Sequence, residues 1–530
     1  MIKCAYCGKK NKDGATYCKR CGIGLPVSAP EEAEVKSAPE VVPPPGAMQV
    51  PPPPGTERFD WTVSPEKTKA KAKQKKKSLL ITLMLIAALL VGALVIWYFA
   101  ATRGEILPSR SGYTALEGAA VHKGELIMPE GEQIVACETS LKGATLGMLA
   151  ESGKLYCYCK GQESLVASYV TRFICSADGA HFIYTDENGL LWSSDCTHPE
   201  NAPVCICNEP VSEFVVSPDG ESVLFNKQGN ADLFMYSNKK ITLAAVSQEP
   251  VSVSNGGRYI YGFSTEDSAL YFTDRRGRSA FVRSNIIGGI YLNSGHNEIV
   301  FSTDSGDGKV ITMICSNGSE PKQIINASGA VEPVFTVSGR RLSVSPAGRT
   351  VVTCPFKSFE NRLFAGAGLA VNTRSGAEVL EPNDCTFAAA TDDYCTVYYI
   401  TNGSVVKRSV NGSAEAVKIC DAASFRISAN GSKLWFTDGT GALWYYSSKI
   451  SEPVIKGVED YVVRPNNGAA LFLRNGTVSR NSDGKVQNSY AFEFDKPVTA
   501  IAADSFGLYG KTEDGWVKLN SGGNKVGWYD

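Results

Sequence analysis

Short apolar runs alternate with polar turns throughout residues 112–530, and one arrangement of them recurs. Each unit holds an apolar strand, a turn close to S-x-D-G, a second apolar strand, a polar turn and a strand with an aromatic residue. Serine and aspartate bond their own backbone and glycine accepts a positive φ, so this motif favours a tight turn. The clearest copies, about 40 residues apart where they are adjacent, begin at Ser176, Ser217, Ser254, Ser345 and Ser428.

Weaker copies of the turn begin at Asn293, Pro465 and Asp504. Evenly spaced short strands without helical periodicity predict an all-β domain, and a period near 40 residues with about four strands predicts the blades of a β-propeller. About ten units can be numbered if residues 146–158 and 392–399 count, which exceeds the usual four to eight blades. The sequence therefore leaves open roughly eight to ten blades, in one ring or in two.

The repeats resemble those of TolB-type and WD40-like β-propellers, whose signature is S-P-D-G followed by an apolar strand and an L-[WY] strand. The matching residues include SPDG from Ser217 and LWYYS from Leu443, within residues 130–527. The resemblance implies a fold but no function, because propellers host binding proteins, scaffolds and enzymes alike. An insertion, FKSFENRLFAGAG at residues 356–368, interrupts the pattern. Insertions often carry a binding surface, so it is the candidate functional loop.

Ring closure needs the two ends of the repeat domain. Residues 126–128 and 134–135 are apolar and precede the first clear unit, so they are candidate closing strands. An open last blade would expose unpaired backbone groups, which natural sheets avoid. We therefore expect the start and the end of the domain to lie side by side.

A different pattern fills residues 78–101, an apolar run without one charged residue. At about 1.5 Å per residue it exceeds the roughly 30 Å hydrocarbon core of a bilayer. Residues 67–77 before it hold seven lysines, which keep that side in the cytoplasm and suit anionic headgroups. The pattern predicts a single-pass protein of the plasma membrane, with a cytoplasmic N-terminus and an extracytoplasmic C-terminal domain.

Four cysteines at the N-terminus follow the pattern C-x2-C-x10-C-x2-C: Cys4, Cys7, Cys18 and Cys21. A disulfide pair or a redox C-x-x-C competes with a metal site, but two such units without a βαβ pattern favour zinc. Four thiolates fill the tetrahedral shell of Zn²⁺, so catalysis at this metal is not expected. The runs CAYCGKK and YCKRCG resemble the short zinc ribbons at the N-termini of many bacterial membrane proteins. The resemblance implies one structural Zn²⁺ and a docking or assembly role.

Composition separates the remaining segments. Residues 26–66 hold 11 of the 26 prolines, which favours a semi-rigid linker over a docking site for a proline-binding domain. The predicted order is a zinc ribbon at 1–25, the proline-rich linker at 26–66, a polybasic segment at 67–77, a transmembrane helix at 78–101, a linker at 102–111 and the propeller-like domain at 112–530.

Net charge differs between the two sides of the predicted membrane span. The first 78 residues carry 15 basic and 8 acidic groups, giving +7, and the other 452 carry 38 and 46, giving −8. A mildly acidic exported domain argues against nucleic acid as its partner.

Twelve cysteines follow the predicted span. An even number outside the cell permits disulfides, but many lie in strand-like apolar runs, which is typical of buried thiols. Only residues 196–207, which include His198, have the form of a loop that a disulfide closes. Both interpretations stay open.

Catalytic signals are sparse, with four scattered histidines and no G-x-S-x-G motif. The favoured function is a non-enzymatic, membrane-anchored receptor or scaffold whose propeller binds a protein, peptide or glycan. The alternative is a cell-surface hydrolase or lyase that uses a propeller cleft. Two carboxylates with an arginine or histidine at the channel would favour the enzyme.

Overall fold

The computed structural model describes residues 112–325, 329–410, 414–449 and 453–519, together with residues 2–3, 10–11, 109 and 524–525. The chain divides into two compact units, Met1–Leu85 and Ile86–Asp530. In the first unit, β1 (Ile2–Lys3) pairs antiparallel with β2 (Lys10–Asn11). These short strands precede and follow Cys4 and Cys7 in the sequence.

Several predicted features lie outside the described residues. They are the zinc ligands Cys4, Cys7, Cys18 and Cys21, the linker at 26–66, the lysine run at 67–77 and the apolar span at 78–101. Among the residues that are described, no helix is long and apolar enough to cross a membrane.

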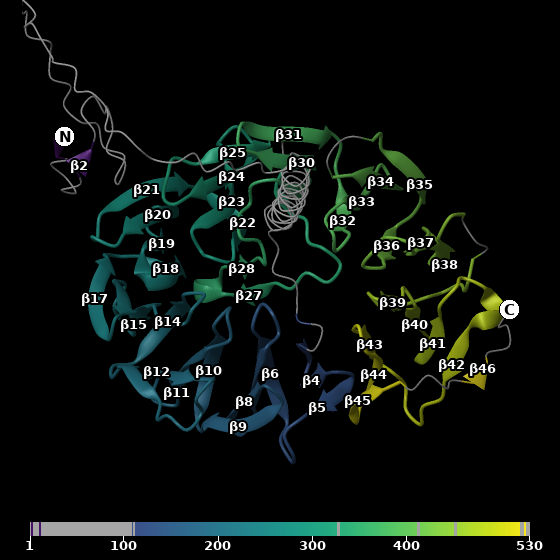
Figure 1. Cartoon of the computed structure of the whole chain (residues 1–530), viewed down its shortest axis with the longest axis horizontal. Helices are drawn as coiled ribbons and strands as arrows, with labels where there is room; N and C mark the ends of the chain where they lie inside the picture. The colour runs from purple at the N-terminus through teal and green to yellow at the C-terminus, as the bar shows by residue number, and fades with distance from the viewer. Residues whose placement is uncertain are drawn as a thin grey trace, which may run out of the picture. The chain divides into compact units, whose positions relative to one another are not determined.

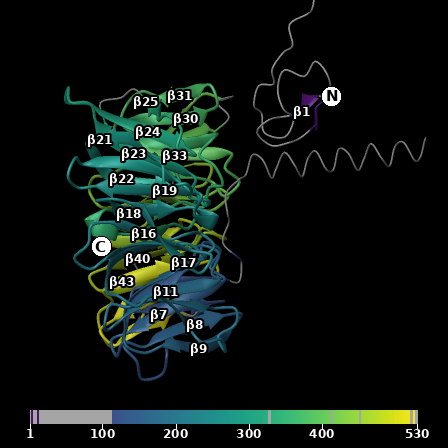
Figure 2. The ribbon, with the colours of Figure 1, turned by 90° about the vertical axis from the view of Figure 1, so that its left-hand side faces the viewer.

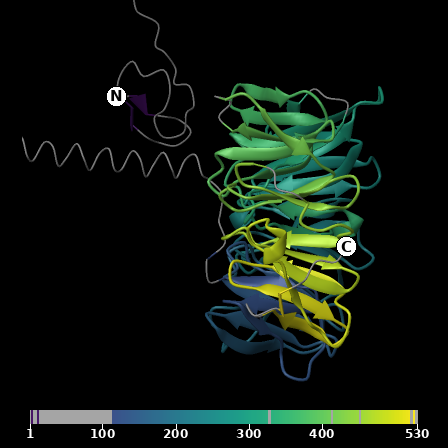
Figure 3. The same ribbon diagram turned by 90° about the vertical axis from the view of Figure 1, so that its right-hand side faces the viewer.

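The described part of the second unit forms eleven β-sheets that stand as blades around one ring (Figure 1). Successive blades follow the chain, and the first strand of each lies nearest the ring axis. The prediction of an all-β propeller is confirmed, with one ring and more blades than the sequence indicated. The side views show the blades standing next to one another (Figures 2 and 3).

Blade 1 has three strands, and blades 2 to 5 have four strands each. Blade 1 comprises β3 (Tyr113–Leu116), β4 (Ala119–His122) and β5 (Glu125–Ile127), and blade 2 comprises β6 (Ile134–Thr139), β7 (Thr145–Ala150), β8 (Leu155–Cys159) and β9 (Gln162–Ala167). Blade 3 comprises β10 (Val170–Cys175), β11 (His181–Asp186), β12 (Leu191–Asp195) and β13 (Val204–Cys207). Blade 4 comprises β14 (Val211–Val216), β15 (Val223–Lys227), β16 (Leu233–Ser237) and β17 (Lys240–Ala245), and blade 5 comprises β18 (Glu249–Val253), β19 (Tyr259–Ser264), β20 (Ala269–Asp274) and β21 (Ser279–Ser284).

Blades 6 to 11 complete the ring. Blade 6 comprises β22 (Ile286–Leu292), β23 (Glu298–Asp304), β24 (Val310–Ser316) and β25 (Lys322–Ile325), and blade 7 comprises β26 (Val331–Pro333), β29 (Arg362–Gly366), β30 (Gly368–Thr373) and β31 (Gly376–Glu381). Blade 8 comprises β32 (Thr386–Ala390), β33 (Thr396–Thr401), β34 (Ser404–Ser409) and β35 (Val417–Asp421), and blade 9 comprises β36 (Ser424–Ile427), β37 (Leu434–Thr437) and β38 (Leu443–Tyr446). Blade 10 comprises β39 (Asp460–Val463), β40 (Ala470–Arg474), β41 (Thr477–Asn481) and β42 (Tyr490–Phe492), joined at its edge by β46 (Asn524–Lys525), and blade 11 comprises β43 (Ala500–Ala503), β44 (Leu508–Thr512) and β45 (Gly515–Lys518).

The S-x-D-G turn joins the first two strands of a blade by local hydrogen bonds. In blade 3 the Ser176 hydroxyl donates to Asp178 at 2.7 Å and accepts the His181 backbone N–H at 2.9 Å, while Gly179 takes φ +82°. Neighbouring turns are also connected, since the Asp178 N–H donates to the Pro218 carbonyl of the next turn at 3.0 Å. The motif therefore stabilises each blade and the contact between blades.

Two blades lack this turn, which explains the difference in blade number. The strands of blade 1 are joined near Gly118, and the first two strands of blade 7 are separated by residues 334–361. The SPAG turn at Ser345, counted above as a repeat, is not part of a blade. It contains the 3-10 helix η2 (Pro346–Gly348), inside the segment that interrupts blade 7. Two further 3-10 helices in the described residues are η1 (Asn255–Gly257) and η3 (Val486–Asn488).

Blades 1 and 11 lie side by side and close the ring (Figures 1 and 3). Trp516 Nε1 donates to the Glu117 carbonyl at 2.8 Å, and Lys518 Nζ lies 3.2 Å from Glu125 Oε1. The expected neighbourhood of the two ends is confirmed. The prediction that residues 126–128 and 134–135 supply closing strands is wrong, because residues 126–127 lie in β5 of blade 1 and residues 134–135 lie in β6 of blade 2. Side-chain contacts therefore join these two blades.

Candidate functional site

The central insertion, residues 334–361 between β26 and β29, crosses the middle of the ring. Its hairpin consists of β27 (Leu342–Val344) and β28 (Val351–Thr353). Strand β28 pairs in parallel with β22, the innermost strand of blade 6, with Ile290 opposite Val351. Blade 6 thereby becomes a six-stranded sheet that extends into the ring (Figure 1).

Polar contacts tie the central insertion to blades 1, 2 and 8. Arg340 Nη2 donates to Thr114 Oγ1 of blade 1 at 3.1 Å, and its Nη1 donates to Thr139 Oγ1 of blade 2 at 3.4 Å. The Ser338 hydroxyl donates to Asp392 of blade 8 at 2.6 Å. Gly143 leaves room for the guanidinium, since a Cβ there would lie 2.1 Å from Arg340 Nη1. The insertion is thus a brace that divides the channel.

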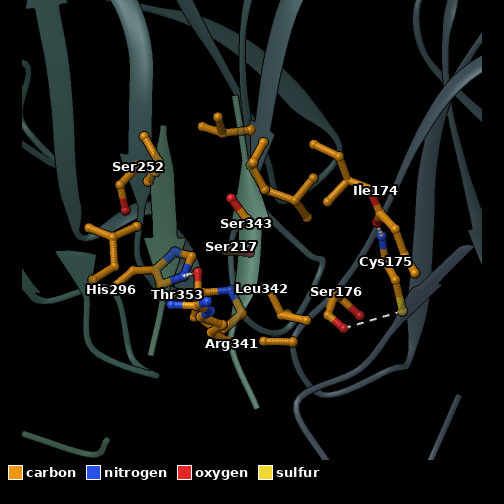
Figure 4. A pocket seen from close by; sticks show the side chains of 18 of the residues that line it. Ile174, Cys175, Ser176, Ser217, Ser252, His296, Arg341, Leu342, Ser343 and Thr353 are labelled. Carbon is orange, nitrogen blue, oxygen red and sulfur yellow. Dashed lines mark hydrogen bonds between the residues drawn. The ribbon is translucent and has the colours of Figure 1, made fainter. Parts of the chain in front are cut away.

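The narrow cavity, of about 200 Å³, lies between the hairpin and blades 1 to 6. Its lining includes Glu138 of blade 2. Ser252 and His296 from the blades and Arg341 and Thr353 from the insertion also line it (Figure 4). Ser252 is 1% exposed, and its hydroxyl has no hydrogen-bond partner among the described residues. A small polar molecule or ordered water suits this cavity better than a macromolecular segment, which needs more volume.

Charged side chains follow the inner strands beside the narrow cavity. Glu138 accepts the Cys175 backbone N–H at 3.0 Å, and burial raises the pKa of its carboxyl to about 7. Arg172 Nη1 lies 2.7 Å from Glu213 Oε2. Burial also raises the pKa of Glu249, which the Arg349 guanidinium partly offsets. The carboxylates of this wall are therefore compensated by Arg172 of blade 3 and by Arg349 of the central insertion.

His296 joins the wall of blade 6 to the hairpin. Its Nδ1 lies 3.1 Å from the Val253 carbonyl and its Nε2 lies 2.9 Å from Thr353 Oγ1. A carbonyl only accepts, so Nδ1 carries the proton and Nε2 accepts from the threonine. Burial lowers the pKa of His296 to about 4. The imidazole is therefore neutral at pH 7, and both of its nitrogens are used.

Acidification is expected to destabilise the domain through His296. The unfolded chain binds a proton near pH 6.5 and the folded one only near pH 4, so this stability is present above pH 6.5 and is lost as pH falls through 4. The loss by pH 4 should be about 3 kcal/mol. Urea unfolding of wild type and His296→Asn between pH 7 and 4 measures it; asparagine suits the positive φ at this position. Equal pH slopes in the two proteins would contradict the prediction.

The wide cavity, of about 640 Å³, lies on the other side of the central insertion. Its blade residues come from β32, β36, β39 and β43, the first strands of blades 8 to 11, and from Pro465 in the turn after β39. Four small side chains line the cavity, those of Ala388, Ala389, Ala502 and Ala503. A further space of about 500 Å³ shares Val337, Pro465 and Ala503 with it and continues past blade 1. The volume accommodates several side chains of a ligand.

Phe387 is the most unusual residue of the wide cavity. It is 54% exposed and takes φ +52°, at a point where the pairing of β32 with β33 shifts register. Bulky residues rarely adopt positive φ, and such strain persists where the surrounding structure holds it, often at binding sites. The bulge presents an aromatic ring at a wall that includes four alanines.

Two arginines and no carboxylates line the wide cavity. The Arg426 guanidinium lies 5.7 Å from the centre of the Tyr461 ring and donates to the Phe425 carbonyl at 3.0 Å. The Arg341 guanidinium lies 5.5 Å from the centre of the Phe335 ring. Neither arginine forms a salt bridge with the part of the chain that is described. The cavity therefore offers positive charge beside apolar surface.

The predicted insertion at residues 356–368 only partly matches the central insertion. Residues 356–361 belong to it, but residues 362–366 form β29 and residue 368 begins β30 of blade 7. Phe356 and Phe359 are fully buried and do not form an exposed binding loop. The residues missed by the sequence are Phe387 and Arg426, which carry no local motif.

No protein-family model matches the chain, and no curated protein matches its sequence. Among solved structures, a eukaryotic initiation factor is 7% identical with a TM-score of 0.39, over 65% of this chain and 95% of that chain. A putative TolB from Agrobacterium tumefaciens is 17% identical with a TM-score of 0.28, over 39% and 85%. Dihydro-heme d1 dehydrogenase NirN, in complex with DHE, is 13% identical with a TM-score of 0.34, over 60% and 75%. With TM-scores this low, the propeller assignment rests on the sheets of the chain itself.

Proposed function

We propose that this chain is a single-pass, membrane-anchored binding protein whose exported propeller holds a segment of a protein or peptide ligand in the wide cavity. The observation that carries the proposal is the strained, exposed Phe387 beside Arg341 and Arg426, two arginines with no salt bridge among the described residues. Aromatic and arginine side chains contribute most strongly to binding hot spots. The ligand segment carries an apolar side chain and a carboxylate, which complement this lining.

The lining favours a peptide over a glycan. Sugar hydroxyls need many hydrogen-bond partners, whereas Thr336 is the hydroxyl side chain in this wall and only the two arginines add strong donors. Alanine, valine and isoleucine supply most of the remaining lining. An acidic, partly apolar segment makes better use of this surface.

Substitutions in the wide cavity are expected to abolish capture of the ligand. Intact cells carrying the full-length chain are treated with an impermeant cross-linker, and captured proteins are identified by mass spectrometry. Phe387→Ser and Arg426→Glu should each lower recovery of the same partner at least tenfold, about 1.4 kcal/mol or more. Phe281→Ser and Arg276→Glu change exposed residues near the outer edge of blade 5 and serve as matched controls. Equal recovery with cavity and control variants would refute the proposed site.

The membrane anchor and the zinc ribbon complete the proposal. The uncharged run at 78–101 behind seven lysines supports anchoring with the propeller outside. The paired C-x-x-C units support one structural Zn²⁺ on Cys4, Cys7, Cys18 and Cys21, which needs no open coordination position. The cytoplasmic ribbon then serves as a docking module for an intracellular partner.

Zinc content is expected to depend on the N-terminal cysteines alone. Elemental analysis of the purified full-length chain should find one zinc per chain, and Cys4→Ser with Cys21→Ser should remove it, because two thiolates cannot hold the ion firmly. Cys420→Ser, a buried cysteine of blade 8, is the control and should retain the zinc. Full zinc content in the double variant would contradict the assignment.

A surface hydrolase or lyase is the second candidate. Glu138 favours it, because a carboxyl with a pKa of about 7 suits general acid–base catalysis. The narrow cavity around it, however, holds only about 200 Å³, and the Glu138 carboxylate already accepts the Cys175 N–H. Binding in the wide cavity is therefore the better supported function.

A further inference from the structure

The thiols of Cys157 and Cys196 meet where blade 2 packs on blade 3. Cys157 lies on β8 directly opposite Gly147 of β7. A Cβ at Gly147 would lie 2.5 Å from Phe173 and 2.9 Å from Phe182, so this face of blade 2 touches blade 3. Both cysteines belong to the same core cluster as those two phenylalanines. They are 1% and 4% exposed, respectively.

The two thiols are hydrogen-bonded to each other. This bond lowers the pKa of the Cys157 thiol and raises that of Cys196, so the pair shares one proton more readily than it loses both; the thiolate is the species that attacks a disulfide. The backbone places Cys196 firmly, because its N–H donates to the Ala180 carbonyl at 2.8 Å. The pair is therefore close, held by two separate blades and chemically suited to oxidation.

Cys207 does not compete for this position. It packs in a core cluster with Phe214 and Val223 of blade 4, whereas Cys196 packs on the blade 2 side. The loop at residues 196–207 thus places its first and last cysteines, Cys196 and Cys207, on opposite faces of blade 3. Cys175, in the same cluster, and Cys159, packed against it, are the alternative partners.

We propose that Cys157 and Cys196 form a disulfide that links blades 2 and 3. The two S–H bonds break, one S–S bond forms, and two electrons and two protons pass to an external disulfide of the glutathione or oxidoreductase class, which leaves as two thiols. The link holds the wall of the narrow cavity, to which Glu138 and Cys175 belong. The disulfide proposal rests on the proposed export of the propeller, because extracytoplasmic compartments keep such bonds oxidised.

Peptide mapping tests the link on the full-length chain. Membranes are prepared with N-ethylmaleimide, which caps free thiols, and the denatured protein is digested without reduction. We expect a joined peptide pair containing Cys157 and Cys196, two hydrogens lighter than its parts. Reduction should then lower the melting temperature of wild type by roughly 3–6 °C. Cys157→Ala should lose this response, and Cys420→Ala, whose core cluster holds no other cysteine, should keep it.

The remaining outcomes distinguish failure of the disulfide proposal from failure of the export proposal. A bond from Cys157 to Cys175, or from Cys196 to Cys207, overturns the pairing. If both thiols are capped, protease added to intact cells shows whether residues after 105 are exported. Capped thiols on an exported domain overturn the link. If the domain is not exported, the purified protein is incubated with glutathione disulfide, and failure to form the Cys157–Cys196 bond overturns the link independently of location.

Discussion

Removal of residues 498–530 is expected to destabilise the entire ring, not only its last blade. The deletion takes away blade 11 and β46, the strand on the edge of blade 10. It also removes four buried side chains from the core shared with blade 10, those of Val498, Ile501, Leu508 and Leu519. At roughly 1.5–3 kcal/mol each, their loss amounts to about 6–12 kcal/mol. Calorimetry should show one transition at a lower temperature.

The matched control breaks only the ion pairs between blades 1 and 11. Lys511 and Lys518 pair with Glu117 and Glu125, and both carboxylates are more than three quarters exposed, at 81% and 78%. Exposed ion pairs contribute about 0–1 kcal/mol, so Lys511→Ala with Lys518→Ala should change stability little. If the truncated chain kept blades that melt at the wild-type temperature, the blades would be independent modules and the cooperative ring would be refuted.

Phe356→Ala is expected to cost about 3–5 kcal/mol, the range for emptying a buried phenylalanine site. This ring of the central insertion is 0% exposed in the core between blades 6 and 7. It stacks on Phe335 with centroids 5.5 Å apart, and the Arg362 guanidinium lies 5.0 Å from its centre. The substitution therefore leaves a cavity and also uncovers a buried cation. Urea unfolding at pH 7 measures the loss.

Phe281→Ala is the control for that experiment, because its ring on β21 is 58% exposed. Exposed substitutions usually change stability by less than about 0.5 kcal/mol. A loss below about 1 kcal/mol for Phe356→Ala would mean that the central insertion is only loosely packed, contrary to a brace across the ring.

Sequence reasoning succeeded where the chemistry is local. The serine hydroxyl of an S-x-D-G turn accepts a backbone N–H five residues later, as Ser217 does from Ser222 at 2.9 Å. Such bonds form within one short stretch, so the pattern alone predicted the strands, the blades and the propeller. The same locality caused one error, because the SPAG turn at Ser345 has the right residues but belongs to the central insertion.

The number of blades could not be predicted from local sequence patterns. Blades 1 and 7 form although neither has the turn, because each sheet packs between two neighbours that cover its faces. Blade 1 has three short strands, and blade 7 has its first strand separated from its second by the central insertion. Only the closed ring shows that these segments are blades.

The candidate site was decided by tertiary structure alone. Phe387, Arg426 and Arg341 come from blade 8, blade 9 and the central insertion, and they line one cavity because each lies near the ring axis. No sequence spacing relates them, since the distance between blades in the chain has no fixed relation to their distance across the channel. The sequence by itself determined the repeat and its turns, through bonds made within a few residues. The ring determined where distant residues converge, through the packing of eleven sheets around one axis.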